Sequence, residues 1–291
     1  MSSIIRYQGQ APCKINLYLK VFEKDLKGYH RLDTAMLKLG LSDQISIVVE
    51  PGSGIDVRVQ GRPDLDQKSN LCFAAVEKIL KFCPHQEQKI SVEIEKHIPI
   101  AAGLAGGSTD AAFVLQNLPS LLNVEISNQD LLEMSKSLGA DVAFFLGQDN
   151  LAILDGRGDV LRSSTSIPPL PLLLVHPPVS VPTGKVFEML GRSLTWPEGS
   201  DNSSLHDLDV SCWRDLSFFY EKGNDLEAVT QKIHPEIGLI RKGMLDQGAL
   251  FSAMSGSGAT VFGLFDHEQY AQKASEKLSK YGRVYCTHAL S

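Results

Sequence analysis

Apolar and polar residues alternate along the first part of the chain with the two-residue period that indicates a half-buried β-strand. The first such run extends from Ile15 to Val21, where polar residues separate the apolar side chains. Three later runs, residues 44–50, 55–59 and 89–95, also predict strands. We therefore expect the N-terminal part of the chain to form a sheet.

Helical spacing appears between and after these strands. Residues 70–82 place apolar side chains three and four positions apart, which predicts a helix. A second helix is predicted at residues 110–118, directly after a stretch of small residues. The two helices and the strands around them indicate a mixed domain in which helices cover a sheet.

A third helix is predicted at residues 128–138. Ser127 and Asp130 before it resemble a helix N-terminal cap, and Gly139 is suited to end the helix. From Gly139 to about Val160 we expect further strands, which complete a first domain of residues 1–162.

The second half of the chain combines strands and helices in a different order. Residues 163–171 are rich in serine, threonine and proline and carry no charge, which is typical of a boundary between domains. In the expected second domain, residues 163–291, a strand at 171–175 precedes a mainly helical stretch, and the chain ends as strand, glycine turn, strand, helix and strand. The helices are predicted at residues 186–192, 213–221, 225–232 and 235–247, with a loop at 195–204. This arrangement favours the α+β class over a doubly wound sheet.

Composition and charge restrict the classes of function. The 291 residues are 43% hydrophobic and 21% charged, as in an ordinary globular protein. A net charge of −6 argues against nucleic acid as a partner, and an anionic substrate would need a local positive site. Apolar runs of about 18 residues are absent, and residues 1–10 are polar, so we expect neither a membrane span nor a signal peptide.

The cysteines do not suggest a metal site or a disulfide framework. Their number is odd and their spacing is wide, and no two of them form a Cys-x-x-Cys motif. We therefore expect reduced thiols in the cytoplasm. The five are Cys13, Cys72, Cys83, Cys212 and Cys286.

A loop of small residues between the strand at 89–95 and the helix at 110–118 is the most informative segment. Its sequence from 103 to 109 is Gly-Leu-Ala-Gly-Gly-Ser-Thr. Small residues let the backbone come close to a ligand, and the N–H groups of a helix N-terminus bind anions. The loop therefore predicts a phosphate site, although it is neither a P-loop nor a dinucleotide fingerprint. The alternative is a flexible turn of small residues.

Four other segments combine polar and small residues and are candidates for a functional site. They are Pro12–Leu17, Gly28–His30, Leu138–Phe145 and Met254–Ala259. Taken singly, each has an ordinary explanation. Lys14 and Asn16 could form a solvated strand face, and His30 could be a surface residue. Asp141 could form an Asx turn, and the segment from Met254 a tight hairpin.

Together these segments resemble the GHMP kinases, the family of galactokinase, homoserine kinase and mevalonate kinase. The three family motifs occur in order, near the N-terminus, at Pro99–Ala112 and at Met254–Ala259. The segments Gly28–His30 and Asn224–Glu227 resemble a branch of the family whose substrate carries a cytidine diphosphate group. The resemblance implies a two-domain α+β fold, with an N-terminal domain like ribosomal protein S5 and a C-terminal α/β sandwich. ATP and substrate would then meet between the domains.

The resemblance also implies a reaction and the residues that carry it. The chain would transfer a phosphoryl group from ATP, with Mg²⁺, to a hydroxyl of the small cytidyl-diphosphate substrate. Asp141 would accept the hydroxyl proton as general base, and Lys14 would orient Asp141 and offset charge on the moving phosphoryl group. Ser108 or Thr109 would help to place Mg²⁺, and no protein carboxylate is assigned to the metal.

The remaining candidate residues are likewise implied by the resemblance. Those for ATP are Asn70, Lys96, Pro99, Gly103, Leu104, Ala105, Gly106, Gly107, Ser108 and Thr109. Those for the substrate are Asn16, Tyr29, His30, Thr183 and Phe187. Tyr29 and Phe187 match an aromatic pair that would stack on cytosine, and His30 matches its cytosine contact. A plain core role remains the alternative for Phe187.

The chain departs from the family pattern at a few positions. Ala105 and Thr109 stand where the family usually has glycine and serine, and Cys13 stands where alanine is usual. A positive φ at Ala105 would be strained, because alanine carries a Cβ.

Two other functions remain open at this point. The chain could be another GHMP kinase, such as a homoserine or mevalonate kinase, although these lack the Gly28–His30 segment. It could also be a catalytically inactive binding protein with the same fold, against which the presence of Lys14 and Asp141 argues.

Overall fold

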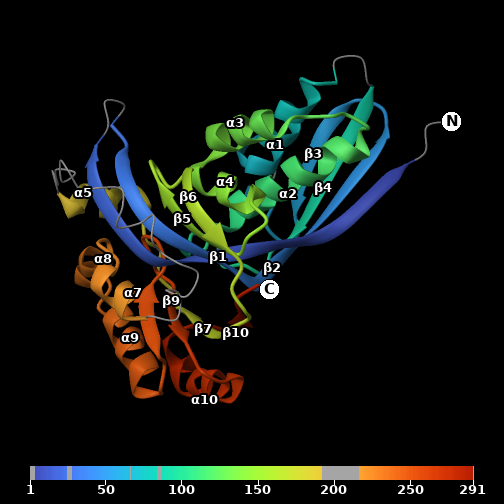
Figure 1. Ribbon diagram of the computed structural model, residues 1–291. Helices are drawn as coiled ribbons and strands as arrows, with labels where there is room; N and C mark the ends of the chain where they lie inside the picture. The colour runs from blue at the N-terminus through green and yellow to red at the C-terminus, as the bar shows by residue number, and fades with distance from the viewer. Residues whose placement is uncertain (1–3, 25–27, 66, 84–86, 192–215, 291) are drawn as a thin grey trace. The chain divides into compact units, whose positions relative to one another are not determined.

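Two long strands, β1 (Ile5–Lys24) and β2 (His30–Pro51), open the chain and pair with each other (Figure 1). The runs predicted at 15–21 and 44–50 are parts of these longer strands. The computed structural model describes residues 4–24, 28–65, 67–83, 87–191 and 216–290. The predicted loop at 195–204 and the beginning of the helix predicted at 213–221 lie outside these residues.

Two compact units share the chain, and both long strands pass from one unit to the other. The first unit consists of residues 1–13, 42–98 and 105–148, and the second of residues 14–41, 99–104 and 149–291. The units are thus interleaved along the sequence. The division into domains 1–162 and 163–291 stays a prediction, although its boundary segment begins inside a strand, β6 (Val160–Thr165).

In the first unit, β2 pairs antiparallel with β4 (Gln88–Glu95), and β4 pairs parallel with β3 (Gly54–Val59). The alternation that predicted β4 is confirmed, because Ile90, Val92 and Ile94 are buried on one face. Four helices pack together, and the first of them packs against β3 (Figure 1). They are α1 (Leu71–Leu80), α2 (Gly106–Leu121), α3 (Asn128–Leu138) and α4 (Ala140–Leu146). Two 3₁₀ helices, η1 (Pro63–Leu65) and η2 (Gln67–Ser69), precede α1.

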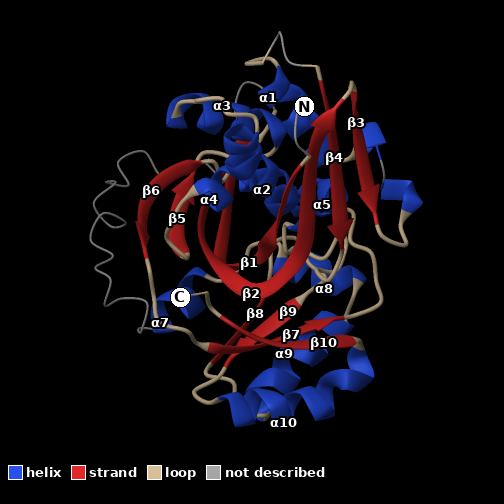
Figure 2. Cartoon of the chain, turned by 90° about the vertical axis from the view of Figure 1, so that its right-hand side faces the viewer, coloured by secondary structure: helices blue, strands red, loops and turns tan. Residues whose placement is uncertain are grey.

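In the second unit, β2 pairs with β5 (Leu151–Asp155), which pairs with β6. A separate antiparallel sheet has the order β10–β7–β9–β8. Its strands are β7 (Pro171–His176), β8 (Phe251–Met254), β9 (Val261–Leu264) and β10 (Arg283–His288). Figure 2 shows α9 and α10 lying against this sheet, whose central strand β7 buries Leu172–Val175 completely.

The helices of the second unit follow the predicted order. They are α5 (Thr183–Leu190), α7 (Leu216–Lys222), α8 (Glu227–Ile233), α9 (Glu236–Asp246) and α10 (Glu268–Leu278), with η4 (Ser279–Tyr281) after the last. The predicted ending of strand, glycine turn, strand, helix and strand is confirmed. Two separate sheets, antiparallel except for the β3–β4 pair, and clustered helices confirm the α+β class.

The prediction of strands directly after Gly139 is wrong. Gly139 has an extended backbone, ends α3 and begins α4 at once. Val142, Phe144 and Phe145 favour strands by propensity, but their spacing also fits one buried helix face. Packing of α4 against α2 and α3 therefore decides the outcome.

The cysteines within the described ranges are not joined to one another by disulfides; they are Cys13, Cys72, Cys83 and Cys286. Within those same ranges, none of the helices combines the length and the apolar character needed to cross a bilayer.

Candidate active site

The small-residue loop leads directly into helix α2, which begins at Gly106, four residues earlier than predicted. Ala105 precedes the helix in the left-handed region, with φ 58° and ψ 33°, so the anticipated positive φ is present. Its methyl group offers no side-chain acceptor to the first N–H groups of α2. The N–H groups of Ser108 and Thr109 donate to the Ala105 carbonyl oxygen, so the N–H groups of Gly106 and of the exposed Gly107, with the helix dipole, are the ones that face an anion there.

Gly103 lies in the second unit and packs closely against the loop that follows β8. Its φ is +78°, and a Cβ built there would lie 2.2 Å from the carbonyl oxygen of Ser255. Only glycine fits at this position, since both the backbone conformation and the space exclude a side chain. The Gly-rich loop and the Ser-Gly-Ser-Gly loop, which the sequence analysis treated separately, are thus in contact at Gly103.

Lys14 is buried on β1 rather than exposed on a solvated strand face. It is 4% exposed, and its Nζ donates to Asn16 Oδ1 at 2.7 Å and to the Gly103 carbonyl oxygen at 3.3 Å. The Asn16 Nδ2 in turn donates to Thr34 Oγ1 at 2.9 Å. The solvated-face alternative is therefore wrong for both Lys14 and Asn16, and the ammonium has a defined orientation.

Ser255 connects this network to the loop after β8. Its Oγ donates to the Gly103 carbonyl oxygen at 2.9 Å and accepts from the Asn16 backbone N at 3.2 Å. The structure thus brings Lys14, Asn16 and Gly103 together with Ser255, a residue that the sequence analysis did not assign to the site. Its position in the third family motif is the sequence feature that could have assigned it to the site.

Two aromatic contacts surround the start of β2. The ring of His30 stacks on Phe187 of α5, with centroids 5.4 Å apart, and the guanidinium of Arg157 lies 4.7 Å from the centre of the Tyr29 ring. His30 Nδ1 lies 2.7 Å from the Phe22 carbonyl oxygen. Because a carbonyl only accepts, Nδ1 is the donor in this contact, and in the neutral imidazole Nε2 is then an acceptor. The stacking of Tyr29 and Phe187 on cytosine stays a prediction.

Thr183 and Phe187, both expected at the substrate, come from the same helix, α5. Thr183 Oγ1 lies 2.8 Å from Ser257 Oγ, and so contacts the loop after β8. Phe187 is half-buried and packs against the apolar core of the second unit. Phe187 therefore has the core role left open for it as well as the stacking contact with the His30 ring.

In the first unit, Lys96 forms ion pairs with two buried carboxylates. Its Nζ lies 2.5 Å from Asp43 Oδ2 and 2.8 Å from Asp110 Oδ2, and its side chain is 13% exposed. A Cβ on Gly106 would lie 3.1 Å from this Nζ, so the ammonium adjoins the start of α2. Asn70, the other residue predicted near adenine, caps α1 by accepting from Cys72 N.

The two carboxylates differ in how well they are satisfied. Asp43 Oδ1 accepts from the backbone N of His97 and of Ile98. Asp110 Oδ1 is buried without a hydrogen-bond partner among the described residues. Burial raises the pKa of Asp110 to about 7, against the opposing effect of Lys96. Burial alone would lower the pKa of Lys96, but the two carboxylates outweigh it and raise that pKa.

Asp141 occupies the first turn of α4, where a carboxylate is favoured by the helix dipole. It is half-buried, and the start of its helix adjoins the start of α2, since a Cβ on Gly139 would lie 4.0 Å from Ser108 Oγ. The Asx-turn alternative is replaced by a helix N-terminus. Asp141 belongs to the first unit and Lys14 to the second, and their pairing stays a prediction.

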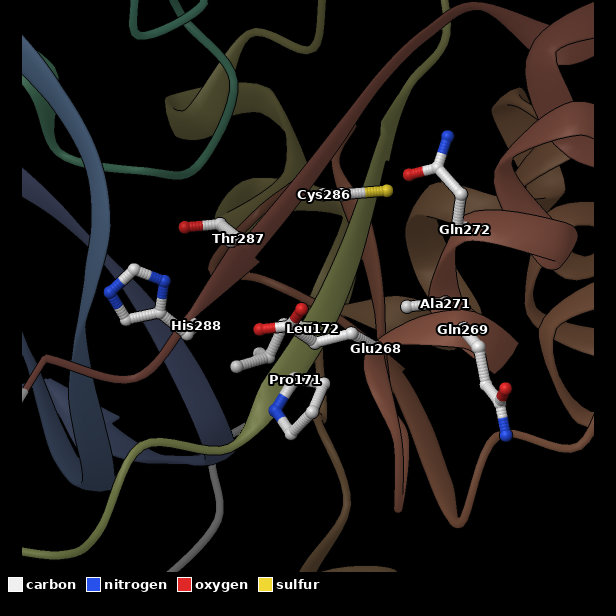
Figure 3. A pocket seen from close by; sticks show the side chains of 9 residues that line it. All are labelled: Pro171, Leu172, Glu268, Gln269, Ala271, Gln272, Cys286, Thr287 and His288. Atoms are coloured by element: carbon white, nitrogen blue, oxygen red, sulfur yellow. The ribbon is translucent and has the colours of Figure 1, made fainter.

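A surface hollow elsewhere does not involve these residues. Figure 3 shows it between β7, β10 and α10, with the side chains of Gln272, Cys286 and His288 at its walls. Its volume is about 390 Å³. It contains none of the predicted site residues.

Comparisons with known proteins identify the family of this chain. Residues 70–148 match the GHMP kinases N terminal domain, and residues 201–284 match GHMP kinases C terminal. A 4-diphosphocytidyl-2-C-methyl-D-erythritol kinase of Geobacter metallireducens is 36% identical over 270 residues, 93% of each chain. The kinase of that name from Desulfotalea psychrophila is 32% identical over 291 residues, 98% of this chain and 96% of its own.

Solved structures of kinases also resemble this chain. A 4-(cytidine 5'-diphospho)-2C-methyl-D-erythritol kinase matches with a TM-score of 0.77 and 31% identity, covering 98% of this chain and all of its own. Homoserine kinase from Cytophaga hutchinsonii shares the fold, with a TM-score of 0.64 and 19% identity over 99% of this chain and 96% of its own. The chain therefore belongs to the GHMP kinase family, among the 4-diphosphocytidyl-2-C-methyl-D-erythritol kinases.

Proposed function

We propose that this chain transfers the γ-phosphoryl group of ATP to the 2-hydroxyl of 4-diphosphocytidyl-2-C-methyl-D-erythritol, a step in making isoprenoid precursors by the non-mevalonate route. The observation that carries the proposal is similarity over the whole chain, at 36% identity, to kinases named for this substrate. The kinases named for homoserine and mevalonate match at 19% and 13% identity, which supports the fold alone.

The start of helix α2 supplies the expected ATP phosphate site. N–H groups without side-chain caps and a partial positive charge favour phosphate oxygens there. Lys96 adds a cation beside Gly106, although its charge is balanced by Asp43 and Asp110. We propose that residues 103–109 bind the phosphates and that Asn70 and Lys96 lie towards the adenine.

Mg²⁺ would bind at this loop mainly through the nucleotide, and not through a cluster of protein side chains. Among residues with described positions, no three His, Cys, Asp or Glu side chains gather to hold a metal ion. Mg²⁺ bound to ATP takes most ligands from phosphates and water. The half-buried Ser108 hydroxyl at the start of α2 is the protein group that would hold it, since Thr109 is buried. Bound there, the ion would neutralise phosphate charge.

The chemical step needs positioning and charge stabilisation more than covalent chemistry. We propose that Asp141 accepts the proton of the substrate hydroxyl. Lys14 stabilises the charge that develops on the transferred group, and Asn16 and the Gly103 carbonyl hold its ammonium in one orientation. Preorientation of this kind matters because a lysine side chain is otherwise flexible.

The cytidine end of the substrate needs a stacking surface and hydrogen bonds to the base edge. Tyr29 is 54% exposed, so part of its ring faces solvent. His30, with Nε2 as acceptor, suits the exocyclic amino group of cytosine, which donates. We propose that Tyr29, His30 and Phe187 bind the base and that Asn16 and Thr183 contact the rest of the substrate.

An ADP-release assay tests the proposal. The purified chain, with ATP and Mg²⁺, should turn over the cytidyl substrate and not mevalonate or homoserine, and phosphorus NMR should show a new monoester. Turnover of mevalonate or homoserine alone would overturn the assignment of substrate. Binding of nucleotide and cytidyl substrate without turnover would instead support the inactive binding protein.

A further inference from the structure

The segment Asn224–Glu227 supported the family assignment, but the proposed function gives it no role. Asn224 lies between α7 and α8, and both the nitrogen and the oxygen of its carboxamide form hydrogen bonds. Its Nδ2 donates to the carbonyl oxygens of Met254 and Gly256, both at 2.8 Å, and its Oδ1 accepts from Leu226 N at 2.9 Å. The side chain thus fastens the main chain of the loop after β8 at two points.

Glu227 holds the same loop from its other side. It is 7% exposed, and its Oε2 accepts from Met254 N at 2.9 Å. Its Oε1 accepts from Arg241 Nη1 at 3.0 Å, and Arg241 Nε donates to the Ser252 carbonyl oxygen. A buried carboxylate with both oxygens occupied is costly to disturb, because each lost bond leaves a charge unsatisfied. The position of the loop is therefore well determined.

Asp225, between these two residues, ties the segment to strand β1. Its carboxylate accepts from Lys20 Nζ at 2.6 Å and from Val21 N at 3.0 Å. Its backbone N donates to the Leu19 carbonyl oxygen at 2.9 Å. The segment thus joins the loop after β8 to the strand that carries Lys14 and Asn16.

The loop in turn lies against two groups that accept from Lys14, the Gly103 carbonyl oxygen and Asn16 Oδ1. Ser255 Oγ donates to the Gly103 carbonyl oxygen, which also accepts from Lys14 Nζ. A Cβ on Gly256 would lie 3.3 Å from that oxygen and 3.5 Å from Asn16 Oδ1. A continuous series of contacts therefore runs from the Asn224 amide to the Lys14 ammonium.

We propose that Asn224 and Glu227 are positioning residues for Lys14. They fix residues 254–256, whose contacts hold the Gly103 carbonyl and Asn16 where these two groups orient the ammonium. The proposal rests on the role proposed above for Lys14. Loss of either residue leaves Lys14 in place but lets its ammonium move, and a displacement of about 1 Å can lower a catalysed rate 100-fold.

The substitution Asn224→Asp tests this, because it keeps the size and removes both donors. We expect kcat to fall by about 10–100-fold, the range for a misplaced catalytic group, with KM for both substrates within a few-fold of wild type. Glu227→Gln keeps an acceptor for Met254 N, and should give the same pattern with a smaller fall in kcat. It also provides a second measurement if Asn224→Asp folds poorly.

Asn150 provides a matched control in the same unit. Its amide donates to the Ile167 and Leu290 carbonyl oxygens and accepts from Ile167 N, the same bonding pattern at another place. Asn150→Asp should lower the melting temperature about as much as Asn224→Asp and leave kcat near wild type. A similar loss of kcat in both variants would mean that stability alone explains the effect, and would overturn the proposal.

A double-mutant cycle with Lys14→Met separates positioning from structure. If Asn224 acts through Lys14, Asn224→Asp should lower kcat little further in the Lys14→Met background. If the kcat of the double variant instead falls by the product of the two single-variant losses, the proposal is overturned. An unchanged kcat in Lys14→Met alone would contradict the role proposed above for Lys14 instead, so the two failures are distinguishable.

Discussion

The Gly103 carbonyl oxygen lies 3.3 Å from Lys14 Nζ, so the main chain of the small-residue loop orients the candidate catalytic ammonium directly. In the proposed mechanism, phosphate binding and charge stabilisation therefore depend on one stretch of backbone. A change that moves this carbonyl should affect the chemical step even where it leaves the ammonium itself intact.

Gly103→Ala is the most direct way to move that carbonyl. The new Cβ would lie 2.2 Å from the Ser255 carbonyl oxygen, and a φ of +78° adds about 1–2 kcal/mol of strain for alanine. We expect a lower melting temperature and a kcat reduced about 10-fold or more. Gly184→Ala is the control, since its Cβ would meet nothing within 4 Å. Equal kcat values in the two variants would contradict the role of the Gly103 carbonyl.

Ala105→Gly should relieve a strain that the native chain carries. Alanine in the left-handed region costs about 1–2 kcal/mol, of which the greater freedom of unfolded glycine cancels a part. We expect a small rise in melting temperature, and ATP affinity within about 1 kcal/mol of wild type, because only N–H groups and small size matter for phosphate binding. Gly106→Val, in contrast, should abolish ATP binding in calorimetry, and near-normal binding would place the phosphates elsewhere.

Asp141→Asn tests the general base. The amide keeps the size of the side chain but accepts no proton, so kcat should fall by about 10²–10⁴-fold with little change in KM. Asp130→Asn, which changes an exposed carboxylate at the start of α3, should leave both values near wild type. Half of the wild-type kcat in Asp141→Asn would exclude the role.

The pH dependence of the free energy of unfolding should reveal the raised pKa of Asp110. Its pKa is raised by burial to about 7, so the folded chain keeps a proton that the unfolded chain loses above about pH 4. The folded state then binds more protons in this window, and stability falls as pH rises towards 7. Lys96 titrates only at alkaline pH and does not change this sign.

Urea unfolding of wild type and Asp110→Asn at pH 5, 6, 7 and 8 measures the effect. The stability of wild type relative to the variant should decrease from pH 5 to about 7 and then level off, because the amide does not titrate. A relative stability that increases over the same range would contradict the raised pKa.

Tyr29→Ala addresses the cytidine end of the substrate. Stacking on an aromatic ring contributes about 1–3 kcal/mol per base, so binding of CDP should weaken by roughly 5–150-fold while an ATP analogue binds as before. Calorimetry with both ligands is the measurement. Equal losses would indicate misfolding, and no loss of either would remove Tyr29 from the substrate site.

Local patterns predicted most of the secondary structure but only part of the site. The period of residues 89–95 and the cap at Ser127 located β4 and α3 closely, since both are properties of neighbouring residues. The loop at 103–109 was found for the same reason. The run after Gly139 was misassigned, because only packing against α2 and α3 decides between helix and strand there.

Partners distant in sequence were not predictable from these patterns. Asp43 lies 53 positions before Lys96, in an alternating strand where a carboxylate suggests an exposed face. Its burial follows from tertiary packing. Ser255 likewise contacts Asn16 across 239 positions, so the network around Lys14 emerges only when the chain is folded.

The interleaved path of the chain limits how this enzyme could be recombined with its relatives. The chain passes between the two units five times, at residues 13–14, 41–42, 98–99, 104–105 and 148–149. A gene exchange with a single crossover therefore always leaves at least one unit built from two parents. Viable chimaeras should be rare unless Gly103, Asn16 and the segment from Asn224 to Met254 come from the same parent, because their mutual contacts are inherited as a set.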